Sequence, residues 1–204
     1  MVQKLGYLKE SPSQTAGPYV HIGCTPNFTG IEGIFDTDLG SAMVSDQTRG
    51  ERITISGYIY DGLGEPLRDA LVEIWQADTD GFHNSPAETR GSADPNFTGW
   101  GRCPTDMDTG IYRFETVKPG RVPFSDGRLQ APHITFWVVA RGINIGLHTR
   151  MYFGDEKAAN DEDPVLARIE LKVRIPTLIA LPVDDGYRFD IRLQGDDETV
   201  FFDI

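Results

Sequence analysis

The sequence has little cysteine, no long hydrophobic run and a shortage of basic residues, and each shortage excludes a class of protein. Cys24 and Cys103 are the only cysteines and have no metal-ligand spacing, so we expect free thiols. No apolar run approaches the roughly 18 residues that a membrane-spanning helix needs. The N-terminal residues lack the basic-then-apolar order of a secretion signal. We therefore expect a cytoplasmic protein with no membrane partner.

The charge balance excludes a nucleic-acid partner. There are 19 Lys and Arg residues against 31 Asp and Glu residues, which gives a formal net charge of −12. Binding to phosphates needs clustered Lys and Arg, which this balance does not favour. An anionic substrate would be repelled by the overall field, so a site for one must carry its own local cations.

The spacing of glycine and proline predicts many short strands joined by turns. The 22 glycines and 13 prolines lie scattered between short apolar runs. In Arg52–Tyr60 the isoleucines 53, 55 and 59 share one parity, which predicts a strand with one buried face. Further strands are predicted at 70–77, 110–117, 133–140, 187–193 and 199–202. The fold class is therefore all-β, an antiparallel β-sandwich with long loops and short helices that forms a single domain over residues 1–204.

Helices are few, and two loops are long. Asp163-Pro164 before residues 165–170 fits a helix N-cap followed by proline at the first helical position, and residues 155–160 suit a short helical turn. Residues 10–30 and 78–105 are rich in glycine, proline and polar side chains. Long ordered loops on a rigid β scaffold are where binding residues and partner contacts gather.

Taken singly, the side chains do not define a reaction. The four histidines are His21, His83, His133 and His148, and none stands in a zinc-type pair or beside a cysteine. A structural or surface role is the simpler interpretation of each. There is no Gly-x-Ser-x-Gly turn, phosphate-binding loop or dinucleotide fingerprint, and no spacing singles out a pair of carboxylates. The residues alone indicate a soluble β-sandwich with two loops suited to function.

Several segments in a fixed order resemble the protocatechuate 3,4-dioxygenase family of intradiol ring-cleaving enzymes. They cover nearly the whole chain, which makes the likeness stronger than a single short motif. They are Ser11–Tyr19, Leu71–Asp78, Asp94–Phe97, Trp100–Arg102, Thr116–Gly120, Ala131–Ile134, Ala140–Ile145, His148–Phe153, and Tyr187–Ile191 continuing to Phe202.

The resemblance implies two related sandwich chains, of which the β chain holds a non-haem Fe(III) through two tyrosines and two histidines. In this sequence the two tyrosine positions fall at His83 and Val122, and the two histidine positions at His133 and Thr135. Phenolate and imidazole donors together suit ferric iron, whereas valine and threonine do not. We therefore expect that this chain holds no metal and that the Fe(III) of the complex belongs to a homologous iron-bearing β subunit.

The same resemblance implies that the chain's own pocket is vestigial. The positions of the substrate-stabilising arginine and glutamine of the catalytic chain are Gln130 and Arg150 here, so both are changed. We expect Arg150 to fill the pocket and to pair with a nearby carboxylate, a structural role. No catalytic residue is expected on this chain alone.

The resemblance is closer to the α chain, whose N-terminal loop and one arginine reach the iron site of β. These correspond here to Thr15, Gly17, Pro18 and Tyr19 and to Arg141, with residues 1–50 as an extended arm on the partner. Gly17-Pro18 allows a close backbone approach and fixes the turn. Arg141 would supply the local cation for an aromatic carboxylate. The alternatives are an interface salt bridge for Arg141 and loop packing for Thr15 and Tyr19.

The implied activity is cleavage of 3,4-dihydroxybenzoate (protocatechuate) with O₂ to 3-carboxy-cis,cis-muconate, with this chain completing the active site of the β subunit. Two alternatives stay open at the level of sequence. One is a self-sufficient intradiol dioxygenase with unusual ligands, and the other is a non-enzymatic binding module of transthyretin-like shape.

Overall fold

A computed structural model describes residues 14–144 and 146–203 of the chain. The strands are β1 (Arg52–Tyr60), β2 (Leu71–Trp75), β3 (Trp100–Pro104), β4 (Ile111–Val117), β5 (His133–Val139), β6 (Leu147–Phe153), β7 (Ile179–Val183), β8 (Gly186–Arg188) and β9 (Ile191–Arg192). The helices are α1 (Pro18–Cys24) and α2 (Lys157–Asp161), with 3₁₀ turns at Leu166–Arg168 and Lys172–Leu178. None of these helices has both the length and the apolar character that a bilayer crossing needs, as far as the described residues extend.

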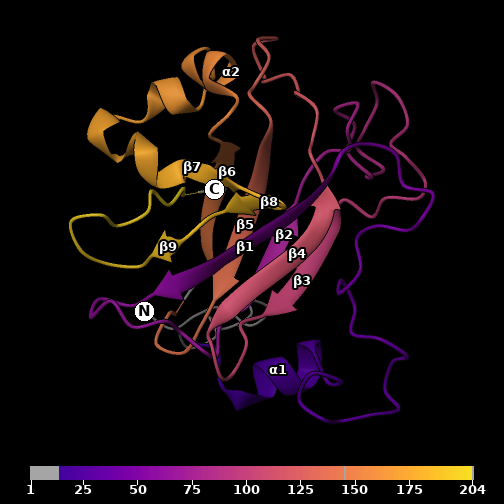
Figure 1. The fold of residues 1–204 in the computed structure, drawn as a ribbon, viewed down its shortest axis with the longest axis vertical. Helices are drawn as coiled ribbons and strands as arrows, with labels where there is room; N and C mark the ends of the chain where they lie inside the picture. The colour runs from indigo at the N-terminus through magenta and orange to yellow at the C-terminus, as the bar shows by residue number, and fades with distance from the viewer. Residues whose placement is uncertain (1–13, 145, 204) are drawn as a thin grey trace, which may run out of the picture.

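The strands form one sheet that folds back over itself (Figure 1). Its order is β3-β2-β5-β6-β7-β8-β1-β4, with β9 paired to β1. β7 joins the two halves because it pairs with β6 on one side and with β8 on the other. The longest pairings are antiparallel, β1 with β4 and β5 with both β2 and β6.

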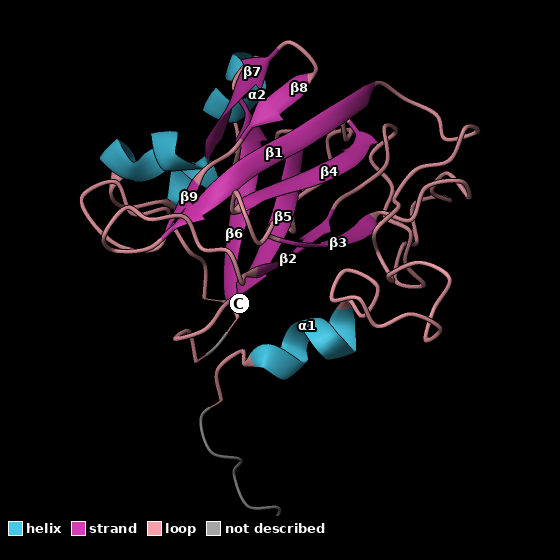
Figure 2. Ribbon diagram, turned by 60° about the horizontal axis from the view of Figure 1, so that its bottom comes forward, coloured by secondary structure: helices cyan, strands magenta, loops and turns pink. Residues whose placement is uncertain are grey.

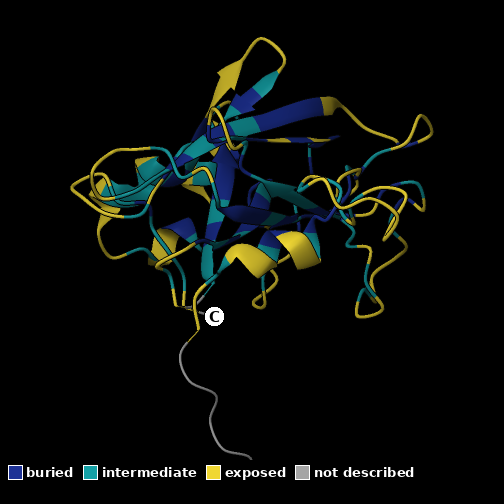
Figure 3. Cartoon of the chain, turned by 90° about the horizontal axis from the view of Figure 1, so that it is seen from below, coloured by how far each residue is buried: buried dark blue, intermediate teal, exposed yellow. Residues whose placement is uncertain are grey.

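The main core lies between the two halves of the sheet. In β5 the buried residues Ile134, Phe136 and Val138 alternate with less buried neighbours, as the two-residue period of a strand requires. They pack with Ile55 of β1 and with other residues of both halves in a single apolar cluster. Figure 3 shows this burial concentrated in the strands, whereas the connecting loops are mostly exposed.

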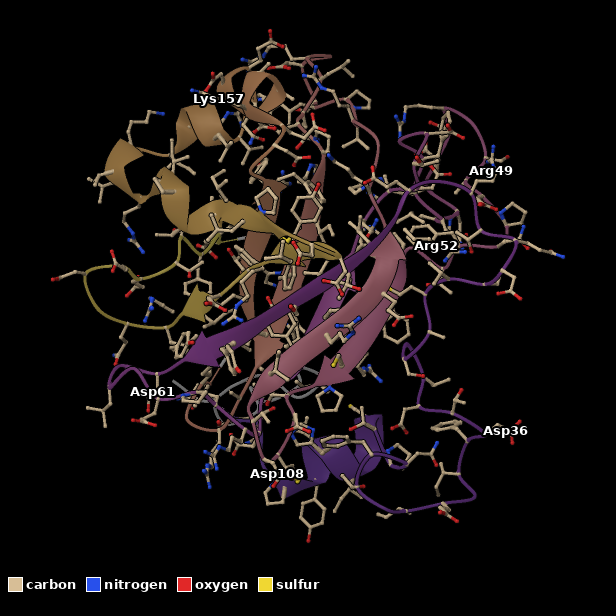
Figure 4. The ribbon with its side chains drawn as sticks, viewed as in Figure 1. Asp36, Arg49, Arg52, Asp61, Asp108 and Lys157 are labelled. Atoms are coloured by element: carbon tan, nitrogen blue, oxygen red, sulfur yellow. The ribbon has the colours of Figure 1, made fainter. Side chains whose placement is uncertain are left out.

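Different helices lie at the two ends of the β sheet. Helix α1 lies at the end where β5 finishes, and Figure 2 shows it beyond the edges of the strands. Helix α2 and the 3₁₀ turns lie at the opposite end. In Figure 4, Asp108 of the turn between β3 and β4 appears at the same end of the view as α1, and Lys157 of α2 appears at the other end. β5 connects the two ends, and its seven residues span roughly 20 Å.

The sequence correctly predicted the fold class and most of the longer strands. The all-β class is confirmed, and the strands predicted at 52–60, 70–77, 110–117 and 133–140 are β1, β2, β4 and β5. The helical turn predicted at 155–160 is α2, shifted by one or two residues. Asp163 caps the next turn as predicted, because its carboxylate accepts hydrogen bonds from the backbone N–H groups of Val165 and Leu166 at 2.8 and 2.9 Å.

The sheet is mostly antiparallel, as predicted, and also contains three short parallel pairs, β6–β7, β1–β8 and β1–β9. Three other predictions about elements were wrong. The strand predicted at 187–193 is broken at Phe189, which turns into the core, and Asp190, whose carboxylate accepts the N–H of Tyr58 at 3.0 Å. The last predicted strand, 199–202, is reduced to one bridge between Phe202 and His148. The helix predicted at 165–170 is a single 3₁₀ turn.

The predicted N-terminal arm is only partly extended. Residues 1–13 lie outside the described residues. Residues 18–24 form α1, which begins at Pro18, as suits a residue without a backbone N–H. Further on, Met43 is buried in the main core and Val44 bridges to Phe97. Residues 14–50 therefore combine a helix, loops and a segment anchored in the core.

The crossing of β1 and the segment after β8 gives a test of the packing. A Cβ atom at Gly57 would collide with the backbone carbonyl of Phe189 and would lie 2.9 Å from the Tyr112 hydroxyl oxygen. We expect Gly57→Ala to destabilise the chain by about 1–3 kcal/mol and to lower Tm by roughly 3–10 °C, measured by thermal unfolding. Gly23→Ala in α1 is the matched control, because no atom lies within 4 Å of the added methyl. Equal Tm values for the two variants would contradict this account of the packing.

Candidate functional site

The six predicted pocket residues gather at the end of the sheet nearest α2, on the face of β5 that points away from the main core. His133 and Thr135 share this face because they alternate with the core residues of β5. The neighbouring strand places Arg150 opposite Thr135 and Tyr152 opposite His133. A second, smaller apolar cluster lies on this side of the sheet and includes Ala131, Tyr152, Leu166 and Leu178.

His133 is held in a single orientation. Its Nδ1–H donates a hydrogen bond of 2.8 Å to the carbonyl of Ala131, and its ring lies 5.8 Å from that of Tyr152. Burial, supported by the positive charge of Arg150, lowers the pKa of His133 to about 4. The ring is therefore neutral at physiological pH. With Nδ1 bound to a carbonyl, Nε2 is the free acceptor, an arrangement that metal-binding histidines also adopt.

Arg150 crosses the pocket but does not pair with a carboxylate. Its Nη1 donates a 2.8 Å hydrogen bond to the side-chain oxygen of Gln130, and its guanidinium lies 6.0 Å from the ring of Phe202. No ion pair of Arg150 occurs within residues 14–144 and 146–203. The predicted carboxylate partner was therefore wrong, because the carboxamide of Gln130 provides the acceptor.

Val122 and Gln130 face each other across a narrow loop between β4 and β5. The backbone N–H of Gln130 donates to the carbonyl of Val122 at 2.9 Å, and Pro123 bridges to Leu129. The side chain of Val122 is buried, with 5% of its surface exposed. A hydrocarbon therefore occupies the position where the resemblance would place an iron-binding phenol.

His83 completes the cluster from the long loop after β2. Its ring stacks on Trp75 with centroids 5.8 Å apart, and Trp75 is the strand partner of Thr135. Burial lowers the pKa of His83, and the carboxylate of Glu88 opposes this shift. Trp75, His83 and Glu88 line a hollow of about 370 Å³ on the surface. His83 thus lies beside the pocket with a neutral ring.

The donors in this pocket do not fit ferric iron. Val122 offers none, and Thr135 offers a neutral hydroxyl in place of an imidazole. The phenol beside His133 is that of Tyr152, and burial raises its pKa well above the ordinary value. Its hydroxyl donates to Asp163 at 3.3 Å, so it is held as a protonated phenol. Within the described residues no group of three or more His, Cys, Asp and Glu side chains is arranged to hold a metal.

A second group of predicted residues lies at the opposite end of β5. The hydroxyl of Thr15 accepts a 2.8 Å hydrogen bond from the N–H of Gly142 and donates one of 3.3 Å to the carbonyl of Ala140. Thr15 therefore brackets Arg141 from both sides. The side chain of Arg141 is 79% exposed, and its Nε lies 3.3 Å from a carboxylate oxygen of Asp69.

Gly17, Pro18 and Tyr19 follow directly as the start of α1. Gly17 is the extended N-cap residue, with φ −113° and ψ −175°, and Pro18 opens the helix. The side chain of Tyr19 is 82% exposed. The structure thus brings Thr15, the start of α1 and Arg141 together on one surface. It separates this surface from the His133 pocket by the length of β5.

Sequence reasoning missed three residues in these two groups. Asp163 was recognised only as a helix cap, yet its buried carboxylate also accepts the N–H of Ala131 at 2.7 Å and so links the cap to the pocket. His21 was treated as an isolated histidine, and Asp69 was not singled out. Nε2 of His21 lies 3.0 Å from the carbonyl of Asp69. No sequence signal identifies this contact, because it joins residues far apart in the chain.

The folded-back β sheet of this chain is shared with solved intradiol ring-cleavage dioxygenases. A solved intradiol ring-cleavage dioxygenase from Tetranychus urticae matches with a TM-score of 0.55 and 20% identity, covering 78% of this chain and 88% of that one. At this level of identity, the match establishes the fold alone.

Sequence comparison identifies the family within this fold. Residues 24–195 match the family model described as Dioxygenase. The chain is 46% identical to the protocatechuate 3,4-dioxygenase alpha chain of Pseudomonas putida, over 97% of this chain and 98% of that relative. It is 36% identical to the beta chain of Burkholderia cepacia, over 82% of this chain and 75% of that relative. The chain therefore belongs to the protocatechuate 3,4-dioxygenase family of ring-cleaving enzymes, and it is more similar to that alpha chain than to that beta chain.

The depressed pKa of His133 predicts a pH dependence. Because the folded value of about 4 lies below the ordinary 6.5, the unfolded state binds more protons between these values. The contribution of His133 to stability is therefore fully present above about pH 6.5 and is lost as the pH falls through about 4. Titration of the ring followed by NMR should give a midpoint near 4.

Arg150→Met should raise this midpoint, because it removes a positive charge that opposes protonation of His133. Arg113→Met is the matched control, since Arg113 is a half-exposed residue of β4 that pairs with Asp185. A His133 midpoint near 6.5 in the unmodified protein would show that the ring is not held in a buried, positively charged setting.

Proposed function

We propose that this chain is the α subunit of a protocatechuate 3,4-dioxygenase that holds no iron itself and completes the active site of an iron-bearing β subunit. The observation that carries the proposal is the donor set of its own pocket. Val122 and Thr135 replace donors that ferric iron needs, while Arg150 and Gln130 satisfy each other across the space. The chain therefore has the β fold of the family, but the side chains of its own pocket do not support iron binding.

The group around Arg141 supports a contribution to a site on another chain. Arg141, Thr15 and Tyr19 are exposed at the end of β5 remote from the His133 pocket, so they are too far away to serve that pocket. An exposed guanidinium can bind a carboxylate through two parallel hydrogen bonds. In a chain of net charge −12, such a local cation is what an anionic aromatic substrate would require.

The proposed substrate is 3,4-dihydroxybenzoate, and the proposed product is 3-carboxy-cis,cis-muconate. The bond between the two hydroxyl-bearing carbons breaks, both atoms of O₂ enter the product, and each of these carbons becomes a carboxyl carbon. The proposed part of this chain is to bind the substrate carboxylate with Arg141. Thr15 and the Gly17–Tyr19 segment form part of the wall of the pocket.

Arg141→Ala tests the assignment of the substrate carboxylate. A charge-assisted hydrogen bond is worth roughly 1.5–3 kcal/mol, so we expect kcat/KM for protocatechuate in the αβ complex to fall by about 10- to 100-fold. Arg113→Ala is the matched control, because Arg113 is also more than half exposed and pairs with an aspartate. Unchanged kinetics in the Arg141→Ala complex would remove Arg141 from the substrate site.

The metal content of the chain provides a separate test. The chain expressed alone should be colourless and bind no ferric iron, because its pocket lacks the required donors, whereas the complex with β should contain iron. Elemental analysis and the visible spectrum of both preparations measure this. An iron-loaded, active chain purified alone would instead identify a self-sufficient dioxygenase. A binding module without enzymatic activity would fail to assemble with any iron-bearing homologue.

A further inference from the structure

Asp69 lies between Arg141 and helix α1, the two parts of the surface that is proposed to reach the partner's site. It lies just before β2, opposite the end of β5, since Leu71 pairs with Val139. Its carboxylate oxygen Oδ2 is 3.3 Å from Nε of Arg141. Its backbone carbonyl is 3.0 Å from Nε2 of His21, which lies on α1. One residue therefore touches both the arginine and the helix.

We propose that Asp69 is a positioning residue that holds Arg141 in the orientation that binds the substrate carboxylate. The proposal rests on the function proposed above for Arg141. In this role Asp69 fixes the guanidinium of Arg141 and also sets the position of Arg141 relative to α1.

The backbone of Arg141 is already fixed, so the remaining freedom lies in its side chain. Thr15 bonds to the carbonyl before Arg141 and to the N–H after it. Asp69 is the ion-pair partner of Arg141 within the described residues, and it engages Nε. Among the described residues the two terminal nitrogens of Arg141 donate no hydrogen bond. They are left as the fork that a carboxylate binds end-on.

His21 connects the same residue to α1. The carbonyl of Asp69 can only accept, so Nε2 of His21 carries the proton and donates. The His21 side chain is buried, and its other ring nitrogen, Nδ1, has no partner among the described residues. The contact with Asp69 is thus the polar anchor of this ring. It fixes the helix that carries Tyr19 against the residue that holds Arg141.

Two effects of Asp69 on an anionic substrate oppose each other. Its charge repels a second carboxylate roughly 7 Å away, an effect worth about 3-fold in binding in water. Without it, the arginine side chain must be ordered by the substrate itself, and the rotamer entropy at stake corresponds to as much as about 30-fold. Positioning therefore outweighs repulsion, and loss of the carboxylate should weaken binding.

Asp69→Asn in the αβ complex tests this. We expect KM for protocatechuate to rise by about 3- to 10-fold while kcat stays within about 2-fold, because the carboxylate contact, and not the reacting end of the ring, is affected. Ki for 4-hydroxybenzoate should rise in parallel, and Ki for phenol, which lacks the carboxylate, should not change. Asp69→Glu should recover most of the loss. A fall in KM, or equal effects on both inhibitors, would overturn the proposal.

Two further variants separate this proposal from the one on which it rests. Asp185→Asn is the matched control, because Asp185 also pairs with an exposed arginine, Arg113, at 3.6 Å. In the Arg141→Ala background, Asp69→Asn should not raise KM further and should lower it by at most about 3-fold, because only the repulsion of the substrate carboxylate is left. If Arg141→Ala alone leaves the kinetics unchanged, the proposed function of Arg141 fails. If Arg141→Ala weakens binding and Asp69→Asn does not, only the role of Asp69 fails.

Discussion

The register of β5 between β2 and β6 is the constraint on which the other features depend. Because side chains alternate along a strand, this register places Ile134, Phe136 and Val138 in the core. The same alternation places His133 and Thr135 on the opposite face. A shift of one residue would exchange the two sets. The strand also ends at the turn that carries Arg141, so one pairing pattern fixes the core, the pocket and the surface proposed for the partner.

The pocket on β5 and β6 combines one histidine in a ligand-like orientation with neighbours that are poor donors for ferric iron. His133 still presents Nε2 with its other nitrogen bound to a carbonyl, as a ligand would. Around it, Val122 is apolar, and Arg150 bonds to the carboxamide of Gln130. A buried polar group without a partner costs about 1–3 kcal/mol, so the pairing of Arg150 with Gln130 stabilises the chain inside this pocket.

Sequence patterns predicted the features that depend only on neighbouring residues in the chain, such as strands and helix caps. The parity of Ile53, Ile55 and Ile59 predicted β1, and Asp163 followed by proline predicted a cap. The parallel pairings of β6–β7 and β1–β8 join segments distant in sequence, and no local pattern contains them. The break at Phe189 and the choice of Gln130 by Arg150 also depend on neighbours that only folding supplies. The resemblance supplied the candidate site residues, but Asp69 and His21 required the folded chain.

The distance between the His133 pocket and Arg141 matters for how an acidic chain could bind the anionic substrate proposed above. At physiological salt, charges more than about 8 Å apart are largely screened, so most of the net charge of −12 contributes little at Arg141. The electrostatic potential at Arg141 is therefore set mainly by its neighbour Asp69, while Thr15 fixes the backbone on either side of Arg141. Asp69 is the one negative charge shown to pair with Arg141 in the described residues, and it engages the inner nitrogen of the guanidinium. The terminal nitrogens donate no hydrogen bond within the described residues, so the acid that neutralises the arginine leaves them available to the carboxylate proposed above.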